Sequence, residues 1–243
     1  MSILYIVATP IGNLEDISMR AIRILSEVDF VLCEDTRVTS RLLNHYNIKT
    51  KTISFHQHSD EKKMDYAVQL LSEGKNLALV SDAGTPGISD PGGKLVEAVI
   101  ERLGEDVQVE SVPGPSAVTA ALSISGISTD KFVFMGFPPH KKGRQTFIFN
   151  ILKSEYPVVV YESKHRIIKF LEELKTMSDA KNNENDNQYD RKAPKIKKVS
   201  SVVVCRELSK MHETVYRGEL TNIIEKIKLN KDDQRGEFVV IVA

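Results

Sequence analysis

The chain has 243 residues, with 33 lysines and arginines against 33 aspartates and glutamates, so its formal net charge is zero. This length exceeds that of an average single domain and excludes a peptide hormone or a short adaptor. The charge balance excludes binding to nucleic acid by bulk attraction, so a nucleic-acid site has to be a local basic patch.

The first half of the chain alternates short apolar runs with amphipathic stretches. Residues 3–8, 28–33, 77–81 and 107–112 are apolar runs without polar alternation, as expected of parallel strands that are covered on both faces. Between them, residues 17–26, 64–72 and 94–103 place their apolar side chains on one helical face. This half therefore predicts a βαβαβαβ unit with a parallel sheet.

The segment Pro113-Gly114-Pro115 interrupts this pattern, and Ser116 can cap the alanine-rich helix that follows to about residue 125. We place the domain boundary here, with an N-terminal α/β domain at 1–114 and a C-terminal α/β domain at 115–243. The strand-like runs of the second domain are 132–135, 158–161, 202–205, 214–217 and 238–242, and its helix-like segments are 146–152, 165–175 and 219–229. The runs at 202–205 and 214–217 are too close for a crossover helix, which predicts an antiparallel pair and a mixed sheet.

Residues 178–198 consist mainly of asparagine, aspartate, lysine and glutamate, with almost no aliphatic side chain. Such a composition buries too little apolar surface to offset the entropy of ordering, so we predict a disordered insertion. Its lysines could touch RNA, but a solvated surface is the simpler interpretation.

Composition also limits the ligands and the location. Cys33 and Cys205 each lie in an apolar run, which is typical of buried thiols, and the six histidines are scattered, so we predict neither a disulfide nor a metal site. No segment approaches the ~18 consecutive apolar residues of a membrane span, and no secretion signal opens the chain. We therefore expect a cytoplasmic protein with no membrane partner.

Three segments rich in glycine and proline directly follow predicted strands of the first domain, at 9–13, 81–87 and 113–116. In open parallel sheets, ligands bind beyond the carboxyl ends of the strands, where glycine lets the backbone approach the ligand. Ordinary βα turns are the alternative for any one of these segments. None of them fits the glycine pattern of a nicotinamide-dinucleotide site or of a P-loop.

The same segments carry a resemblance to a known family. The motif Thr9-Pro10-Ile11-Gly12-Asn13 and the segments 5–14, 33–37, 81–86, 88–92, 112–117 and 206–208 resemble the RsmI family. These are bacterial ribosomal RNA small-subunit methyltransferases of the tetrapyrrole-methylase superfamily (class III methyltransferases). The resemblance implies S-adenosylmethionine-dependent 2′-O-methylation of a cytidine ribose in small-subunit (16S) ribosomal RNA. It also implies a cytoplasmic homodimer whose cofactor occupies the cleft between two α/β domains.

The resemblance further implies which residues contact the cofactor. They are Pro10, Asp82, Ala83, Gly84, Thr85, Ser116, Ala117 and Leu208. Asp82 suits the amino or ribose groups of the cofactor, although an aspartate in a turn also commonly bonds its own backbone. The family usually has a proline where Lys164 stands and a small C-terminal domain beyond residue 243, which suggests a divergent or reduced member.

Charged residues at strand ends are candidates for catalysis, because the attacking ribose hydroxyl is weakly acidic. We expect Glu162 and Glu207 to act as the base or to orient it, and Arg206 to pair with a phosphate or a carboxylate. An ion-pair network that joins helices to the sheet is the alternative for each of them.

The expected RNA contacts are cationic residues at strand ends and in one basic loop. They are Arg37, Lys141, Lys142, Arg144, His165 and Arg166. The three cations at 141–144 follow a strand and could clamp an RNA backbone, with an ordinary solvated loop as the alternative.

Two other functions share this fold. One is a C-methyltransferase that acts on a tetrapyrrole of the precorrin type, but its first loop typically carries a glycine-rich form and not Thr-Pro-Ile-Gly-Asn. The other is a non-catalytic ribosome-assembly protein that binds RNA, against which the intact cofactor loops argue.

Overall fold

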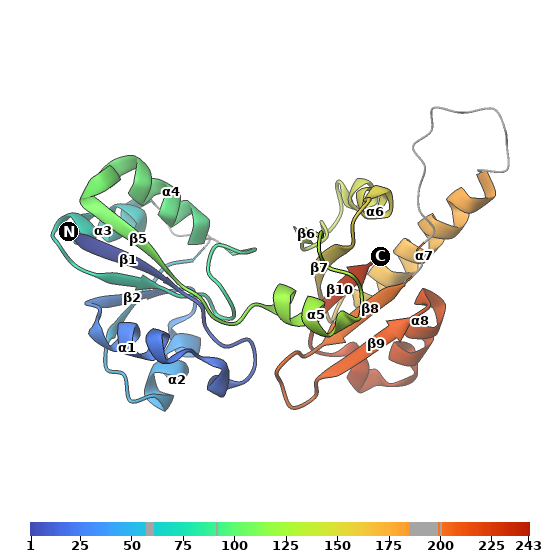
Figure 1. Ribbon diagram of the computed structural model, residues 1–243, viewed down its shortest axis with the longest axis horizontal. Helices are drawn as coiled ribbons and strands as arrows, with labels where there is room; N and C mark the ends of the chain where they lie inside the picture. Colours follow the sequence, from blue (N-terminus) through green and yellow to red (C-terminus); the bar gives the residue numbers. More distant parts are fainter. Residues whose placement is uncertain (57–60, 91, 185–198, 200) are drawn as a thin grey trace. The chain divides into compact units, whose positions relative to one another are not determined.

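A computed structural model describes residues 1–56, 61–90, 92–184, 199 and 201–243. The chain forms two compact α/β units, Met1–Ser116 and Ala117–Ala243 (Figure 1). Within the described ranges, no helix combines the length and the apolar character needed to cross a bilayer.

The first unit is built on a five-stranded sheet in the order β3-β2-β4-β1-β5. Its strands are β1 (Ser2–Val7), β2 (Phe30–Cys33), β3 (Lys51–Ser54), β4 (Leu77–Leu79) and β5 (Val107–Val112). All neighbouring strands are parallel, so the prediction of a parallel sheet is confirmed. Consequently, the carboxyl ends of all five strands lie at one edge of this sheet.

Helices cover both faces of this sheet (Figure 1). The helices α1 (Met19–Glu27) and α2 (Thr36–His45) share one core with Val7 and Val31, whereas α3 (Glu61–Ser72) and α4 (Gly92–Leu103) share another with Leu4 and Leu32. Two short 3-10 helices, η1 (Leu14–Asp16) and η2 (Gly104–Asp106), complete the unit. Burial on both faces explains the apolar runs of the inner strands β1, β2 and β4. The expectation of such a run at 107–112 requires a correction, because β5 lies at an edge of the sheet and carries polar, partly exposed residues.

Two elements of this unit, α2 and β3, are absent from the sequence-based prediction. The strand β3 lies at the edge of the sheet and mixes polar with apolar residues, so it lacks the apolar run that marks the other strands. Asp35 caps the N-terminus of α2 by accepting a hydrogen bond from the Arg37 backbone N–H.

The second unit is built on a sheet in the order β6-β7-β10-β8-β9. Its strands are β6 (Val133–Gly136), β7 (Val158–Ser163), β8 (Val202–Arg206), β9 (Thr214–Gly218) and β10 (Glu237–Val242). Strands β6 and β7 are parallel and the other pairs are antiparallel, so the predictions of a mixed sheet and of an antiparallel β8–β9 pair are confirmed.

Alternate residues of β7, β8 and β10, such as Val160, Val204 and Val240, form one core with the helices α6 (Arg144–Lys153), α7 (Ile167–Glu184) and α8 (Leu220–Leu229). The helix α5 (Ala117–Ser125) packs against β10, and its buried side chains lie outside that core. The short helix η3 (Lys231–Gln234) follows α8.

The expected disordered segment at 178–198 requires a correction. Residues 178–184 belong to α7, because Ser178 is buried and an ion pair between Lys175 and Asp179 spans one helical turn. The part of the expected segment at 185–198 lies outside the described residues. The start of α7 also differs, since His165 and Arg166 precede the helix and do not open it.

Candidate functional site

Three loops meet at the carboxyl edge of the first sheet. Thr9, after β1, and Gly84, after β4, exchange two backbone hydrogen bonds with N···O distances of 2.9 and 3.1 Å. The buried Thr9 hydroxyl also donates to the carbonyl oxygen of Ser81 at 3.1 Å. These contacts fix the first and second loops relative to each other.

The third loop, after β5, joins the same assembly. The Thr85 hydroxyl donates to the carbonyl oxygen of Pro115 at 3.2 Å. A Cβ atom added at Gly114 would lie 3.0 Å from the Cβ of Ala8, so glycine permits this close approach of the third loop to the end of β1. The prediction that the three segments face one place is thus met within this unit.

The expected cofactor residues are divided between the two units. This edge of the first unit carries Pro10, Asp82, Ala83, Gly84, Thr85 and Ser116. In the second unit, Ala117 is the first residue of α5, and Leu208 is buried in the connection between β8 and β9. Asp82 and Ala83 are exposed, so their polar groups are accessible to a ligand.

The edge is acidic. The Asp82 carboxylate accepts a hydrogen bond from the Asp35 backbone N–H at 3.1 Å. Burial raises the pKa of Glu34, and the nearby carboxylates of Asp82 and Asp90 raise it further. A concentration of negative charge of this kind favours a ligand with positive charge.

One residue that closes the second loop was not singled out by sequence reasoning. Asp90 Oδ1 accepts hydrogen bonds from the backbone N–H groups of Gly87 and Gly92, both at 2.7 Å, just where α4 begins. The signal was an aspartate among glycines and prolines at a helix start, a pattern typical of caps and turns.

Arg37, an expected RNA contact, lies at the start of α2. Its side chain is 85% exposed and forms an ion pair with Asp35 at 2.6 Å. Hydrogen bonds from Arg37 lower the pKa of Asp35 to about 2. The exposed guanidinium can still approach a ligand, because surface pairs of this kind contribute little and exchange readily.

In the second unit, Glu162 and Arg144 are buried, which corrects the expectation that they face substrate. The Glu162 side chain is 0% exposed and lies 3.0 Å from Arg166 Nε and 3.7 Å from Arg144 Nη1. The Arg144 guanidinium, 5% exposed, also contacts Glu173 at 2.6 Å. A carboxylate enclosed in this way does not reach a ribose hydroxyl, and Arg144 and Arg166 direct their donors inward.

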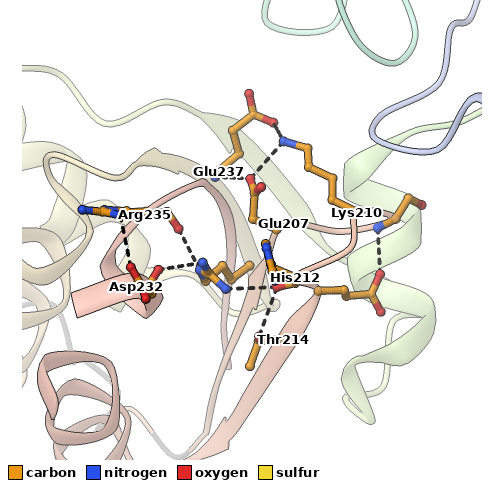
Figure 2. A network of polar contacts seen from close by, with 10 residues as sticks. Glu207, Lys210, His212, Thr214, Asp232, Arg235 and Glu237 are labelled. Atoms are coloured by element: carbon orange, nitrogen blue, oxygen red, sulfur yellow. Dashed lines mark hydrogen bonds and ion pairs between the residues drawn. The ribbon is translucent and has the colours of Figure 1, made fainter. Parts of the chain in front are cut away.

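Arg206 is also committed to the protein itself. Its guanidinium donates to the backbone carbonyl oxygens of Arg235 at 2.7 Å, His212 at 3.0 Å and Asp232 at 2.6 Å (Figure 2). It is buried, with Asp233 at 3.8 Å. Of the two partners expected for Arg206, a phosphate or a carboxylate, the structure places a carboxylate of the chain, Asp233, beside it. The expectation of a phosphate is corrected, because the guanidinium is occupied by partners within the chain.

Glu207 lies beside it in the same network (Figure 2). Its carboxylate accepts hydrogen bonds from Lys210 Nζ and from the Glu237 backbone N–H, both at 2.9 Å. Burial alone would raise the pKa of Glu207, but these hydrogen bonds outweigh it and leave the pKa below its ordinary value. A weakly basic, paired carboxylate is suited to orienting the connection between β8 and β9, in which Glu207 lies, and poorly suited to accepting a proton.

Sequence reasoning also missed Tyr161 of β7. Its hydroxyl accepts a hydrogen bond from the Val118 backbone N–H in the first turn of α5, directly after Ala117, and burial raises its pKa. The alternation along β7 places Tyr161 and Glu162 on opposite faces of the sheet, which is the signal that could have identified it.

The remaining expected RNA contacts are exposed. Lys141 and Lys142 lie in the loop between β6 and α6, and His165 lies between β7 and α7. In the part of the chain that the structure describes, no group of three or more histidine, cysteine, aspartate or glutamate side chains could hold a metal ion. The cysteines Cys33 and Cys205 are buried and free.

Comparison with known proteins identifies a family. The sequence model of the tetrapyrrole (corrin/porphyrin) methylases matches residues 3–224. Proteins named ribosomal RNA small subunit methyltransferase I are similar along the whole chain. The one from Synechocystis is 40% identical over 100% of this chain and 79% of its own length, and the one from Thermotoga maritima is 39% identical over 100% and 99%. That from Escherichia coli O157:H7 is 38% identical over 98% and 77%.

Solved structures give the same fold. A cobalt precorrin-4 methyltransferase superposes with a TM-score of 0.67 at 17% identity, covering 99% of this chain and 94% of the other. The uroporphyrin-III C-methyltransferase from Thermus thermophilus superposes with a TM-score of 0.62 at 16% identity, covering 100% and 94%. At such low identity, the likeness concerns the fold and not the substrate.

Proposed function

Because the chain belongs to the tetrapyrrole methylases and to the family of ribosomal RNA small subunit methyltransferase I, we propose that it methylates the 2′-oxygen of a cytidine ribose in small-subunit (16S) ribosomal RNA, with S-adenosylmethionine as the methyl donor. The observation that carries the proposal is the identity of 38–40% along nearly the whole chain to relatives of that name.

The three loops of the first unit are the proposed cofactor platform. Gly84 has a φ of +83° and lies against the first and third loops, so a glycine at this position lets the three loops approach one another closely. Asp82 and the neighbouring carboxylates suit a cofactor that carries a sulfonium and an ammonium group. The residues proposed to hold it are Pro10, Asp82, Ala83, Gly84, Thr85 and Ser116, with Ala117 and Leu208 from the second unit.

When bound, S-adenosylmethionine supplies a methyl group on a sulfonium, and its transfer to the ribose oxygen leaves the thioether and releases the hydroxyl proton. The chain's own contribution is alignment, since an in-line displacement depends on holding the reacting atoms about 3–3.5 Å apart. In this proposal, Glu162 and Glu207 orient neighbouring loops of the chain and take no part in the methyl transfer itself, because both are already paired with cations. We do not assign the role of proton acceptor for the ribose hydroxyl to either glutamate.

Lys141, Lys142, Arg37 and His165 are the proposed RNA contacts. All four are exposed and cationic or able to become so, as contacts to phosphate require. Arg144, Arg166 and Arg206 are left out of this set, because their guanidinium groups are occupied by carboxylates and carbonyl oxygens of the chain.

A transfer assay tests the proposal. Purified protein is incubated with S-adenosylmethionine labelled in its methyl group and with either small ribosomal subunits or a precorrin-type tetrapyrrole. We expect label on a cytidine ribose of the small-subunit RNA. Label on the tetrapyrrole alone would establish the C-methyltransferase alternative, and cofactor binding without any transfer would establish the non-catalytic one.

A pair of variants ties the assay to the site. Asp82→Asn removes a carboxylate of the proposed platform, whereas Asp106→Asn removes an equally exposed carboxylate that directly precedes β5, at the opposite edge of the same sheet. We expect the affinity for S-adenosylmethionine to fall about tenfold or more, or ~1.4 kcal/mol, in the first variant only. Equal affinities in both variants would contradict the assignment.

We also propose that the protein is a cytoplasmic homodimer, as the family resemblance implies. Light scattering on the purified protein is expected to give a mass of twice 27.3 kDa. A mass of one chain at assay concentration would contradict the dimer and leave the reaction untouched.

A further inference from the structure

Four charged side chains of the second unit form a cluster, in which Arg144 and Glu162 are buried and Arg166 and Glu173 are partly buried. Glu162 lies near the end of β7, Arg144 is the first residue of α6, and Glu173 lies within α7. Arg166 lies in the turn between β7 and α7, directly before the helix. Arg166 contacts Glu162 at 3.0 Å, and Arg144 contacts Glu173 at 2.6 Å. The side chains of Arg144 and Glu162 are 5% and 0% exposed.

Both arginines of this cluster also hold the loop at residues 137–143, which connects β6 to α6. Arg144 Nη1 donates to the carbonyl oxygen of Pro139 at 3.1 Å, and Arg166 Nη1 donates to that of Pro138 at 3.0 Å. Prolines have no backbone N–H, so this stretch lacks two of the donors with which a loop could bond itself. The two arginines of the cluster therefore hold the carbonyl groups of two consecutive residues of the loop by hydrogen bonds.

The held loop carries exposed cations. Lys141 and Lys142 directly follow the two prolines and His140, and all three are exposed. The loop ends at Gly143, and the Arg144 backbone N–H donates to the carbonyl oxygen of Lys141 at 3.2 Å. The lysines are thus presented on a short stretch of backbone that is attached at both ends to the cluster.

Stability alone does not account for this arrangement. Buried charges lose their hydration, and well-packed apolar side chains often stabilise a fold as well as a buried ion pair or better. Arg144 Nη2 and Glu162 Oε2 are both buried and, within the described part of the chain, have no hydrogen-bond partner. The charged groups add directional hydrogen bonds, which apolar packing cannot provide. A single guanidinium can bond a carboxylate and a prolyl carbonyl at the same time.

We propose that Glu162, Arg144 and Arg166 are positioning residues, which hold the loop at 137–143 so that Lys141 and Lys142 meet RNA phosphates in a fixed geometry. The role of the two lysines rests on the proposed function. The holding of the loop does not, and it can be measured without any substrate.

Tryptic cleavage after Lys141 and Lys142 in the native protein tests whether the loop is held. Two variants loosen it in different ways: Glu162→Gln removes the central charge, and Arg166→Lys keeps a cation beside Glu162 but loses the planar group that also reaches Pro138. We expect cleavage at these two bonds to become about tenfold faster in both, because local opening controls the rate. Unchanged rates in both would overturn the proposal.

A matched control separates local loosening from general loss of stability. Asp233→Asn removes a carboxylate that pairs with another buried arginine of the same unit, Arg206, whose hydrogen bonds to backbone carbonyls go to Arg235, His212 and Asp232 and not to the loop. Its thermal unfolding is compared with that of Glu162→Gln, and cleavage after Lys141 and Lys142 is expected to stay at the wild-type rate. Equal acceleration in the control would show that the loop responds to global stability, and this would overturn the proposal.

A double-mutant cycle tests whether the cluster acts through the lysines. We expect Glu162→Gln to raise the KM for small subunits about tenfold while kcat and the affinity for S-adenosylmethionine stay near wild type. In a background of Lys141→Ala and Lys142→Ala, the same substitution is expected to add nothing, and additive effects would overturn the positioning role. If the wild-type protein methylates no RNA, the proposed function fails, whereas the cleavage rates still decide whether the cluster holds the loop.

Discussion

Gly84 offers a direct test of the proposed cofactor platform, because two effects of one substitution can be separated there. Its φ is +83°, a left-handed conformation that residues with a Cβ atom adopt at a cost. A Cβ atom built on Gly84 would lie 3.5 Å from Ile11 Cγ2 and 3.7 Å from the Pro115 carbonyl oxygen, which are ordinary van der Waals distances. Gly84→Ala therefore meets backbone strain but no clash within its own loops.

The size of the effect follows from this geometry. The left-handed conformation alone is expected to lower the free energy of unfolding by about 1–2 kcal/mol. Gly74, in the connection between α3 and β4, has the same φ of +83° and nothing within 4 Å of its added Cβ atom. Gly74→Ala should therefore show the same loss of stability, in the same unit and away from the three loops.

Urea unfolding followed by circular dichroism measures stability, and calorimetric titration measures the affinity for S-adenosylmethionine. We expect both variants to lose similar stability, but only Gly84→Ala to lose affinity for the cofactor, by about tenfold, since its methyl group enters the space between the three loops that form the proposed platform. Equal affinities in the two variants would refute the placement of the cofactor against Gly84. A much larger loss of stability in Gly84→Ala alone would refute the claim that its Cβ meets no clash.

Three further predictions concern stability, pH and salt. Ser18→Ala removes the side chain that accepts the Ala21 N–H at the start of α1, and urea unfolding should show a loss of about 1 kcal/mol; no loss would refute the capping role. The raised pKa of Glu34 makes its ionised form unfavourable in the folded state, so stability falls as pH rises through that pKa, and Glu34→Gln should exceed wild type in stability at pH 7 but not below about pH 4. An advantage that persists at low pH would contradict this cause. Replacing Lys141 and Lys142 together by alanine should flatten the log–log salt dependence of RNA binding by roughly 0.7–0.9 per lysine, and an unchanged slope would remove both from the interface.

Much of the fold could be predicted because the inner strands of both sheets are buried. Strands such as β1 and β4 are covered on both faces and therefore consist mainly of apolar residues, a pattern that can be recognised in the sequence. Strand β3 was not predicted, because it lies at the edge of the sheet and mixes polar with apolar residues. Helix α7 was predicted too short because its charged C-terminal turns have the composition of a loop, although an ion pair of Lys175 with Asp179 supports them as a helix.

The candidate site was predictable only in part, for a related reason. Loops at strand ends are contiguous in sequence, so the segments around Thr9, Gly84 and Pro115 could be recognised one by one, and a parallel sheet brings them together. The partners of a charged side chain come instead from distant elements. Arg144 meets Glu173 across 29 residues and Arg206 meets the carbonyl of Asp232 across 26, so nothing in the local sequence distinguishes these arginines from exposed ones.

Because some arginines are buried and paired, the zero net charge of the chain does not describe the charge that its surface presents to RNA. Several arginines that could have formed a basic surface, among them Arg144, Arg166 and Arg206, are neutralised inside the second unit by carboxylates and carbonyl groups. The proposed function assigns phosphate contacts to only four of the exposed cationic or titratable side chains, Lys141, Lys142, Arg37 and His165. So few phosphate contacts would give weak, only mildly salt-dependent non-specific binding. In the proposed function, the enzyme depends more on where these cations are held than on how many it has, and two of the arginines that are occupied inside the unit, Arg144 and Arg166, hold the loop that carries Lys141 and Lys142.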